Sequence, residues 1–183
     1  MIKRNSVLLI LFIFSSFLYS QKEKSDKHVI TYTNSNNIEF LFNREKGYSN
    51  EPIIPNKGFE LEINSFHGFY FLKSLSLSAG IGLAYHVSEN ILAIPIVGEI
   101  KFHLNPYYYD GPFVSLNAGR NLKVGNFKSG GSAKLGIGYL FYDDTDFMYV
   151  ISIFAKSKEY TLDNSTNFNL QTLSLGISAG IQF

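Results

Sequence analysis

The sequence predicts an all-β fold: a closed antiparallel eight-stranded transmembrane up-and-down β-barrel. Apolar residues recur at every second position in several segments, which is the period of a strand and not of a helix. The alternate positions hold mostly Ser and Gly, and several segments reach the roughly 9–11 residues that a tilted strand needs to cross a bilayer. The chain has 183 residues, 45% hydrophobic and 17% charged, and this length favours one barrel domain, which we place over 37–183.

Residues 1–20 predict a secretory signal peptide. Lys3 and Arg4 precede an apolar run over 7–14, and small or polar residues lead to the cleavage expected after Ser20. The run is too short for a spanning helix, which needs roughly 20 apolar residues. Loss of the two basic residues changes the formal net charge from +1 to −1. Residues 21–36 are expected to form a flexible N-terminal lead, with a strand over 29–33 as the alternative.

Eight strands follow from the alternation and from the turn residues between its segments. In 74–86, Leu75, Leu77 and Ile81 share one face, while Ser76 and Ser78 share the other. Segments 131–142 and 170–183 repeat this pattern. Clusters of Gly, Pro, Asn, Asp and Ser separate the segments and mark turns. The predicted strands are 37–43, 58–71, 74–86, 91–104, 112–120, 131–142, 147–157 and 170–183.

The composition of the second face predicts which side points outward. A strand surface in water is usually rich in charged residues, but here it holds Ser and Gly. The lumen of an eight-stranded barrel is just wide enough for side chains to fill, and small residues suit it. Hydrocarbon outside would also require a closed sheet, because an unpaired backbone amide in lipid costs several kcal/mol. The parity leaves exceptions: Met148, Val150 and Phe154 fall on the lumen side, and Arg120 on the apolar side. A register shifted by one residue is therefore the alternative for 147–157.

The connections predict an orientation. If the first strand starts in the periplasm, the links 72–73, 105–111 and 143–146 lie inside, and 44–57, 87–90, 121–130 and 158–169 lie outside. Most long links then fall outside, as in bacterial outer-membrane barrels, and aromatic residues flank all three inner turns.

Four segments carry a resemblance to a known family: 94–102, 111–119, 136–139 and 173–183. Through them the chain resembles the small outer-membrane β-barrel (porin-like, OmpA/OmpX-type) families over about 58–183. It implies a location in the cell outer membrane, with lipids and lipopolysaccharide as partners. It also implies that Phe183 is part of the C-terminal signal that the barrel-assembly machinery reads.

Six charged residues are predicted to point into the lumen as a structural network, because buried charges are tolerated when they are paired. An ion-conducting path is the alternative reading of the same residues. They are Glu60, Glu62, Glu99, Lys101, Lys134 and Lys156.

The composition excludes several kinds of functional site. There is no Cys, hence no disulfide, thiolate metal site or thiol nucleophile, and the balanced charge gives no reason to expect nucleic acid. His67, His86 and His103 show no recognisable catalytic or metal-binding spacing, so we expect no enzyme activity, cofactor or metal. The expected role is structural or surface-binding, through outer loops whose ligand the sequence does not identify. The alternatives are a lipid-modifying enzyme of the outer membrane, of the lipid A deacylase or acyltransferase type, and a soluble secreted ligand-binding barrel.

Overall fold

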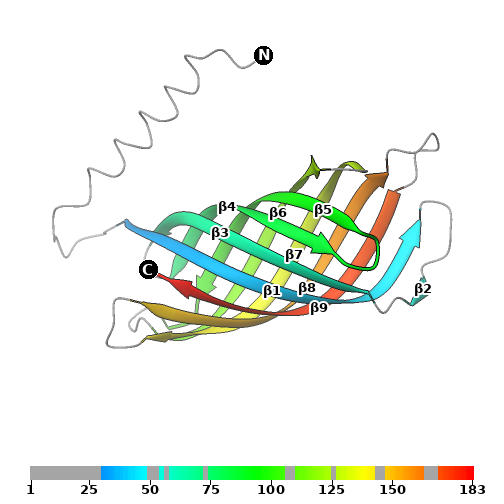
Figure 1. Cartoon of the computed structure of the whole chain (residues 1–183). Helices are drawn as coiled ribbons and strands as arrows, with labels where there is room; N and C mark the ends of the chain where they lie inside the picture. Colours follow the sequence, from blue (N-terminus) through cyan, green and yellow to red (C-terminus); the bar gives the residue numbers. More distant parts are fainter. Residues whose placement is uncertain are drawn as a thin grey trace, which may run out of the picture.

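A computed structural model shows a single β-barrel, in which β1 (Thr31–Tyr48) and β9 (Asn169–Gln182) lie side by side and close the sheet (Figure 1). The structure describes residues 30–48, 54–55, 58–71, 74–105, 110–124, 127–142, 147–162 and 169–183. The predicted signal peptide, 1–20, and the predicted inner turns at 72–73 and 143–146 lie outside these residues. In the described part of the chain, no helix has the length and apolar character needed to span a membrane.

Eight long strands form the barrel, each antiparallel to its neighbours in chain order, and the short β2 adds only to the edge of β1. The predicted fold class, a closed eight-stranded up-and-down barrel, is confirmed. The strands are β1 (Thr31–Tyr48), β2 (Ile54–Pro55), β3 (Phe59–Phe71), β4 (Leu75–His86), β5 (Ile91–His103), β6 (Gly111–Val124), β7 (Phe127–Tyr142), β8 (Met148–Leu162) and β9 (Asn169–Gln182).

The first strand is longer than predicted. Residues 31–36 were expected within a flexible lead, and this is wrong, because β1 begins at Thr31. Asn34 pairs with His67 of β3, and Ser35 pairs with Gln182 of β9. Barrel closure requires β1 to pair along both edges, and this backbone pairing does not depend on apolar side chains. The rest of the predicted lead, up to residue 29, lies outside the described residues.

Three predicted outer loops are also shorter than expected, because the strands continue into them. The structure shows strand over 44–48 and 54–55, over 121–124 and 127–130, and over 158–162 and at 169. The turn at 87–90 is short, as predicted: Asn90 has a φ of 50° and its side-chain oxygen accepts a hydrogen bond from Tyr85 Oη at 2.9 Å. We call the end of the barrel that carries the 87–90 turn the far end. The opposite end, where β1 begins and β9 finishes, is the termini end.

Side chains alternate between the lumen and the outer face. Ile81 is 55% exposed and Ile177 is 51% exposed, whereas Ser76 and Ser174 are both 2% exposed. Apolar side chains therefore point away from the barrel axis and the serines point towards it. This is the arrangement that the sequence predicts.

Two clusters of apolar side chains are buried inside the barrel. Towards the far end, Tyr160 and Leu170 are buried together with Ala84, Ile91 and Ala93. Towards the termini end lies a second cluster, which contains Phe113, Leu140, Val150 and Met148.

Val150 and Phe154 face the lumen, as their parity indicated. The strand register predicted for this region is therefore correct. Glycines make room for such large rings: an added Cβ at Gly80 would lie 2.5 Å from the Phe66 ring, and one at Gly176 would overlap the Phe154 ring.

Candidate functional site

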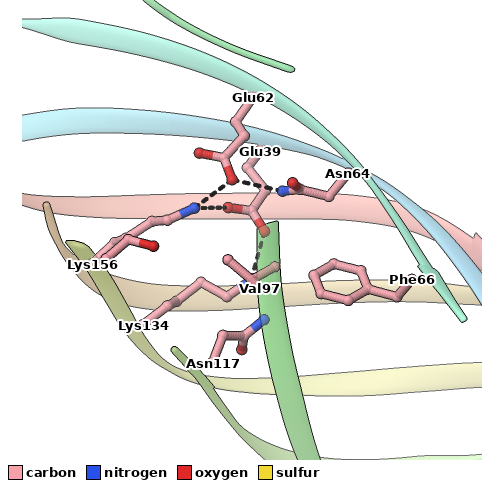
Figure 2. Close-up of a pocket in the computed structure, with 9 residues that line it drawn as sticks. Glu39, Glu62, Asn64, Phe66, Val97, Asn117, Lys134 and Lys156 are labelled. Carbon is pink, nitrogen blue, oxygen red and sulfur yellow. Dashed lines mark hydrogen bonds and ion pairs between the residues drawn. The ribbon is translucent and has the colours of Figure 1, made fainter. Parts of the chain in front are cut away.

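Six charged side chains form a continuous chain of ion pairs across the middle of the lumen. Lys134 Nζ donates to Glu39 Oε1 at 2.5 Å, and Lys156 Nζ donates both to Glu39 Oε2 at 3.1 Å and to Glu62 Oε1 at 2.6 Å. Lys158 Nζ lies 2.5 Å from Glu62 Oε2 and also pairs with Glu60. Figure 2 shows Lys156 reaching between the two carboxylates. We call these six residues the central ion-pair chain.

Strand parity brings these side chains together. Glu60 and Glu62 stand two positions apart on β3, and Lys156 and Lys158 stand two positions apart on β8, so each pair shares the lumen side of its strand. All the members are almost fully buried. Negative and positive charges alternate along the central ion-pair chain, which has three acids and three bases. Each buried charge therefore has an opposite charge beside it.

The predicted residues all lie inside the barrel, but they do not form a single network. Glu60, Glu62, Lys134 and Lys156 belong to the central ion-pair chain. Glu99 and Lys101 form a separate pair on β5, with 3.3 Å between Lys101 Nζ and Glu99 Oε1. Asn117 donates to the other Glu99 oxygen at 3.1 Å, and Lys101 donates to Gln182 at 3.5 Å.

Two members were missed from the sequence, Glu39 and Lys158. Glu39 lies within the predicted first strand, at the same parity as Leu41 and Asn43, which are also buried. Lys158 lay one residue beyond the predicted end of its strand. Extending the alternation of Lys156 by one more step would have found it.

A small cavity of about 10 Å³ adjoins the central ion-pair chain, and that volume holds roughly one water. Asn64 and Asn117 line it (Figure 2). Among the described residues, neither Asn64 Oδ1 nor Asn117 Oδ1 has a hydrogen-bond partner. A water in the cavity would have both oxygens as acceptors, but the space admits no larger ligand.

The ion pairs link opposite sides of the barrel wall. Ion pairs join β1 and β3 to β7 and β8 across the lumen, and the two apolar clusters lie beyond them towards the ends. Ions crossing such a lumen would have to displace paired charges and pass apolar side chains. This geometry disfavours the conducting alternative and also a ligand-binding interior.

A second polar group lies at the far end of the lumen. The Asn43 amide lies 2.6 Å from His86 Nε2 and accepts a hydrogen bond from Ser174 Oγ at 2.5 Å. The backbone N–H of Glu89 donates to His86 Nδ1 at 3.3 Å, and Lys46 pairs with the Glu89 carboxylate at 2.5 Å. His86 is fully buried, so this group fixes the turn to the barrel wall and is closed to a lipid substrate.

His103, the third histidine named in the sequence analysis, ends β5 and faces the lumen, as His86 does. Its ring lies 5.0 Å from the Tyr70 ring and 6.0 Å from the Phe113 ring, measured between centroids. No cluster of three His, Asp or Glu side chains suited to a metal occurs among the residues that the structure describes.

A polar group on the outer face was not recognised from the sequence. Ser65 and His67 are the only polar side chains among the outward positions of β3, with Ser65 Oγ 3.4 Å from His67 Nε2. Tyr32 Oη lies 2.5 Å from His67 Nδ1, and Asn34 Nδ2 lies 3.3 Å from the same atom.

Phe183 lies at the termini end, 49% exposed on the outer face. Its ring meets the Phe147 ring edge-on at 5.9 Å, and its backbone exchanges two hydrogen bonds with Asn34. The last residue is thus held in the sheet while its ring stays accessible.

No family model matches the chain, and no curated protein sequence matches it. Solved structures with a similar course of the chain include Neisserial surface protein A, at 13% identity and a TM-score of 0.45, with 82% of this chain and 97% of that one covered. Another is the attachment invasion locus protein Ail of Yersinia pestis, in complex with the heparin analogue sucrose octasulfate. It has 15% identity and a TM-score of 0.38, with 83% and 99% covered. A de novo designed transmembrane β-barrel has 12% identity and a TM-score of 0.34, with 80% and 94% covered. None of these likenesses assigns a role to a residue of this chain.

Proposed function

We propose that the chain is an integral outer-membrane β-barrel protein with a structural or surface-binding role. The observation that carries this proposal is the inversion of polarity: the ion pairs are buried in the lumen, while the outer face is apolar. All eight long strands expose large apolar side chains there, for example Ile38, Ile63, Ile100, Leu116 and Leu135, each 45–58% exposed.

Such a surface supports lipid as the surrounding medium. Soluble monomers rarely expose contiguous apolar patches above a few hundred Å², and here the apolar face continues around the whole barrel. Closure of the sheet between β1 and β9 removes the open edges that hydrocarbon would penalise. A soluble ligand-binding barrel would need the reverse arrangement, with an apolar interior large enough for a ligand.

The two ends of the barrel would then have different roles. The termini end faces the periplasm, where Phe183 serves as the residue that the barrel-assembly machinery reads. The far end faces outward, and its loops contact lipopolysaccharide or external molecules. The filled lumen gives the protein a rigid body without a channel.

Membrane fractionation combined with gel migration tests this proposal. The full chain is expected in the outer-membrane fraction, soluble only with detergent. Unboiled samples should migrate differently from boiled ones, because a closed barrel resists unfolding in cold sodium dodecyl sulfate. Recovery of the chain in the soluble periplasm without detergent would contradict the proposal.

A second candidate function, lipid modification, rests on the outward-facing Ser65 and His67. It ranks lower because Ser65 is the middle residue of β3, which places its hydroxyl near the middle of the bilayer and away from lipid esters. If the pair is catalytic, Ser65→Ala and His67→Ala will each abolish release of fatty acid from lipids by the refolded barrel. Equal release by wild type, both variants and a protein-free blank would remove this candidate.

A further inference from the structure

An apolar hollow lies on the outer face over β7, β8 and β9, bordered on one side by β1. Its volume is about 480 Å³. Apolar residues line most of it, and among the residues that the structure describes Arg44 is the only charged one in the lining. Phe42, Leu135, Ala155 and Leu175 are among the apolar residues that line it.

The hollow exists because a small residue stands between large ones. Ala155 pairs with Leu135 on one side and with Leu175 on the other. In the next row, Ile153 stands between Ile137 and Ile177, and all three are exposed. The missing side-chain volume at Ala155 leaves a depression bounded by two leucines and closed by isoleucines towards the termini end.

A β-bulge directs Arg44 to this hollow. In the pairing of β1 with β9, Asn43 faces Ser174 and Glu45 faces Leu173, so Arg44 is the extra residue with no partner on β9. A bulge of this kind re-aims a side chain. Asn43 is buried, and Arg44 and Glu45 are both exposed. No ion pair links Arg44 to a carboxylate among the residues that the structure describes.

The hollow spans the depth that one lipid leaflet would occupy. Leu135, Ala155 and Leu175 lie close to the middle of their strands. Arg44 lies about five residues past the middle of β1. At roughly 3.3 Å per residue and a tilt near 40°, that is about 12 Å along the membrane normal. A guanidinium there reaches the headgroup level of a hydrocarbon core about 30 Å thick.

We propose that this hollow binds an anionic lipid, with one acyl chain over Ala155 and the lipid phosphate paired with Arg44. The inference rests on the proposed function, because it requires the outer face to meet a bilayer. The planar guanidinium matches phosphate oxygens with two parallel hydrogen bonds. The rest of the described lining is apolar, so only a lipid with net negative charge neutralises Arg44. In a zwitterionic lipid such as phosphatidylcholine, the choline already neutralises the phosphate.

Lipid retention by the purified full chain tests the site. The barrel is mixed in detergent with phosphatidylglycerol or with phosphatidylcholine of the same acyl chains, and bound lipid is counted by native mass spectrometry. Wild type is expected to retain one phosphatidylglycerol in preference to phosphatidylcholine. Arg44→Gln should weaken the phosphatidylglycerol affinity about tenfold, which corresponds to about 1.4 kcal/mol. Ala155→Phe should weaken retention of both lipids, because it fills the hollow.

Arg120 provides the matched control. It is also an exposed arginine on the outer face, on β6, but it does not line the hollow. Arg120→Gln should therefore leave retention unchanged. Equal retention of the two lipids by wild type, or unaltered retention by Arg44→Gln or Ala155→Phe, overturns the lipid site. Equal weakening by Arg44→Gln and Arg120→Gln also overturns it, since the effect would then be one of total charge.

Heat-modifiable migration after insertion into lipid vesicles separates this inference from the proposed function. A wild-type chain that inserts but shows no preference overturns the lipid site alone. A wild-type chain that never inserts overturns both.

Discussion

Glu39 on β1 accepts a hydrogen bond from Lys134 on β7 at 2.5 Å, although the two residues are 95 positions apart in the chain. Glu39 also contacts Lys156 of β8, so a single carboxylate connects three strands through the lumen. The contact lies inside the barrel wall and is independent of the backbone ladders. Two kinds of interaction therefore hold the barrel together: the backbone pairing that closes the sheet, and the ion pairs across its interior.

Removal of Glu39 should destabilise the barrel strongly. Glu39→Ala leaves two buried lysines short of a counter-charge, and breaking a buried pair in this way costs about 3–5 kcal/mol. Glu39→Gln should cost less, because the amide oxygen still accepts one hydrogen bond. Urea titration in detergent, followed by circular dichroism because the chain has no Trp, measures the change. Glu45→Gln, at an exposed position of the same strand, should change stability by no more than about 0.5 kcal/mol.

Glu60 and Lys158 should be energetically coupled. Both are buried and paired with each other, so removing one leaves the other charge exposed to a medium of low polarity. In a double-mutant cycle, Glu60→Gln with Lys158→Met should cost less than the two single changes added together, by about 1–3 kcal/mol. Additive single effects would mean that the pair contributes no interaction of its own.

Gly80 should not tolerate a side chain while Phe66 is present. An added Cβ at Gly80 would meet three atoms of the Phe66 ring at 2.5–3.0 Å, so Gly80→Ala should cost about 1–3 kcal/mol through overpacking. Phe66→Leu, introduced together with Gly80→Ala, should recover part of that loss. Gly98 is the control, because an added Cβ there meets nothing closer than 3.9 Å. Gly98→Ala should be neutral or stabilising in the same urea titration.

The alternation of apolar and small residues was enough to predict the closed barrel and most of its strands. It failed where strands continue past the apolar band, as at Lys158, because a lysine after Lys156 and Ser157 resembles the start of a loop in water. It also failed at Asn34 and Asn36, whose polar side chains resemble a solvated lead although their backbone completes the sheet. Lys158 continues the alternation of β8, so a longer strand assignment would have included it. Asn36 is decided by the pairing of β1 with the distant β9, which a single sequence does not contain.

For the candidate site, too, the sequence predicted which side of each strand a residue faces but not which residues contact each other. Parity placed Glu60 and Lys134 in the lumen correctly, but it did not indicate that both belong to one chain of contacts while Glu99 stays outside it. The barrel's shear sets which lumen positions face each other. The bulge at Arg44 could not be predicted from the sequence, because it is a shift in the pairing of β1 with β9.

Purified protein in a planar bilayer should show no steady single-channel current. Paired charges fill the middle of the lumen, and apolar clusters around Leu170 and Phe113 lie towards its ends. The double change Glu39→Ala with Lys134→Ala enlarges the central cavity but leaves both clusters in place, so it should also fail to conduct. A steady current from the wild type would favour the conducting alternative, and a current from the double variant alone would assign the block to the charges.

Ile81→Arg should impair membrane insertion more than an arginine placed near the end of a strand. Ile81 is 55% exposed on the outer face and lies close to the middle of β4, where an arginine in a barrel costs about 2–4 kcal/mol. Gln171 is also exposed and faces outward, but it lies two residues after β9 begins at the far end, where the cost falls to about 0–1 kcal/mol. Folding into phospholipid vesicles, scored by the fraction of heat-modifiable protein, compares Ile81→Arg with Gln171→Arg. If water and not lipid surrounds the barrel, Ile81→Arg will fold as well as Gln171→Arg and will be the more soluble of the two without detergent. A deficit confined to Ile81→Arg would instead place the middle of β4 in hydrocarbon.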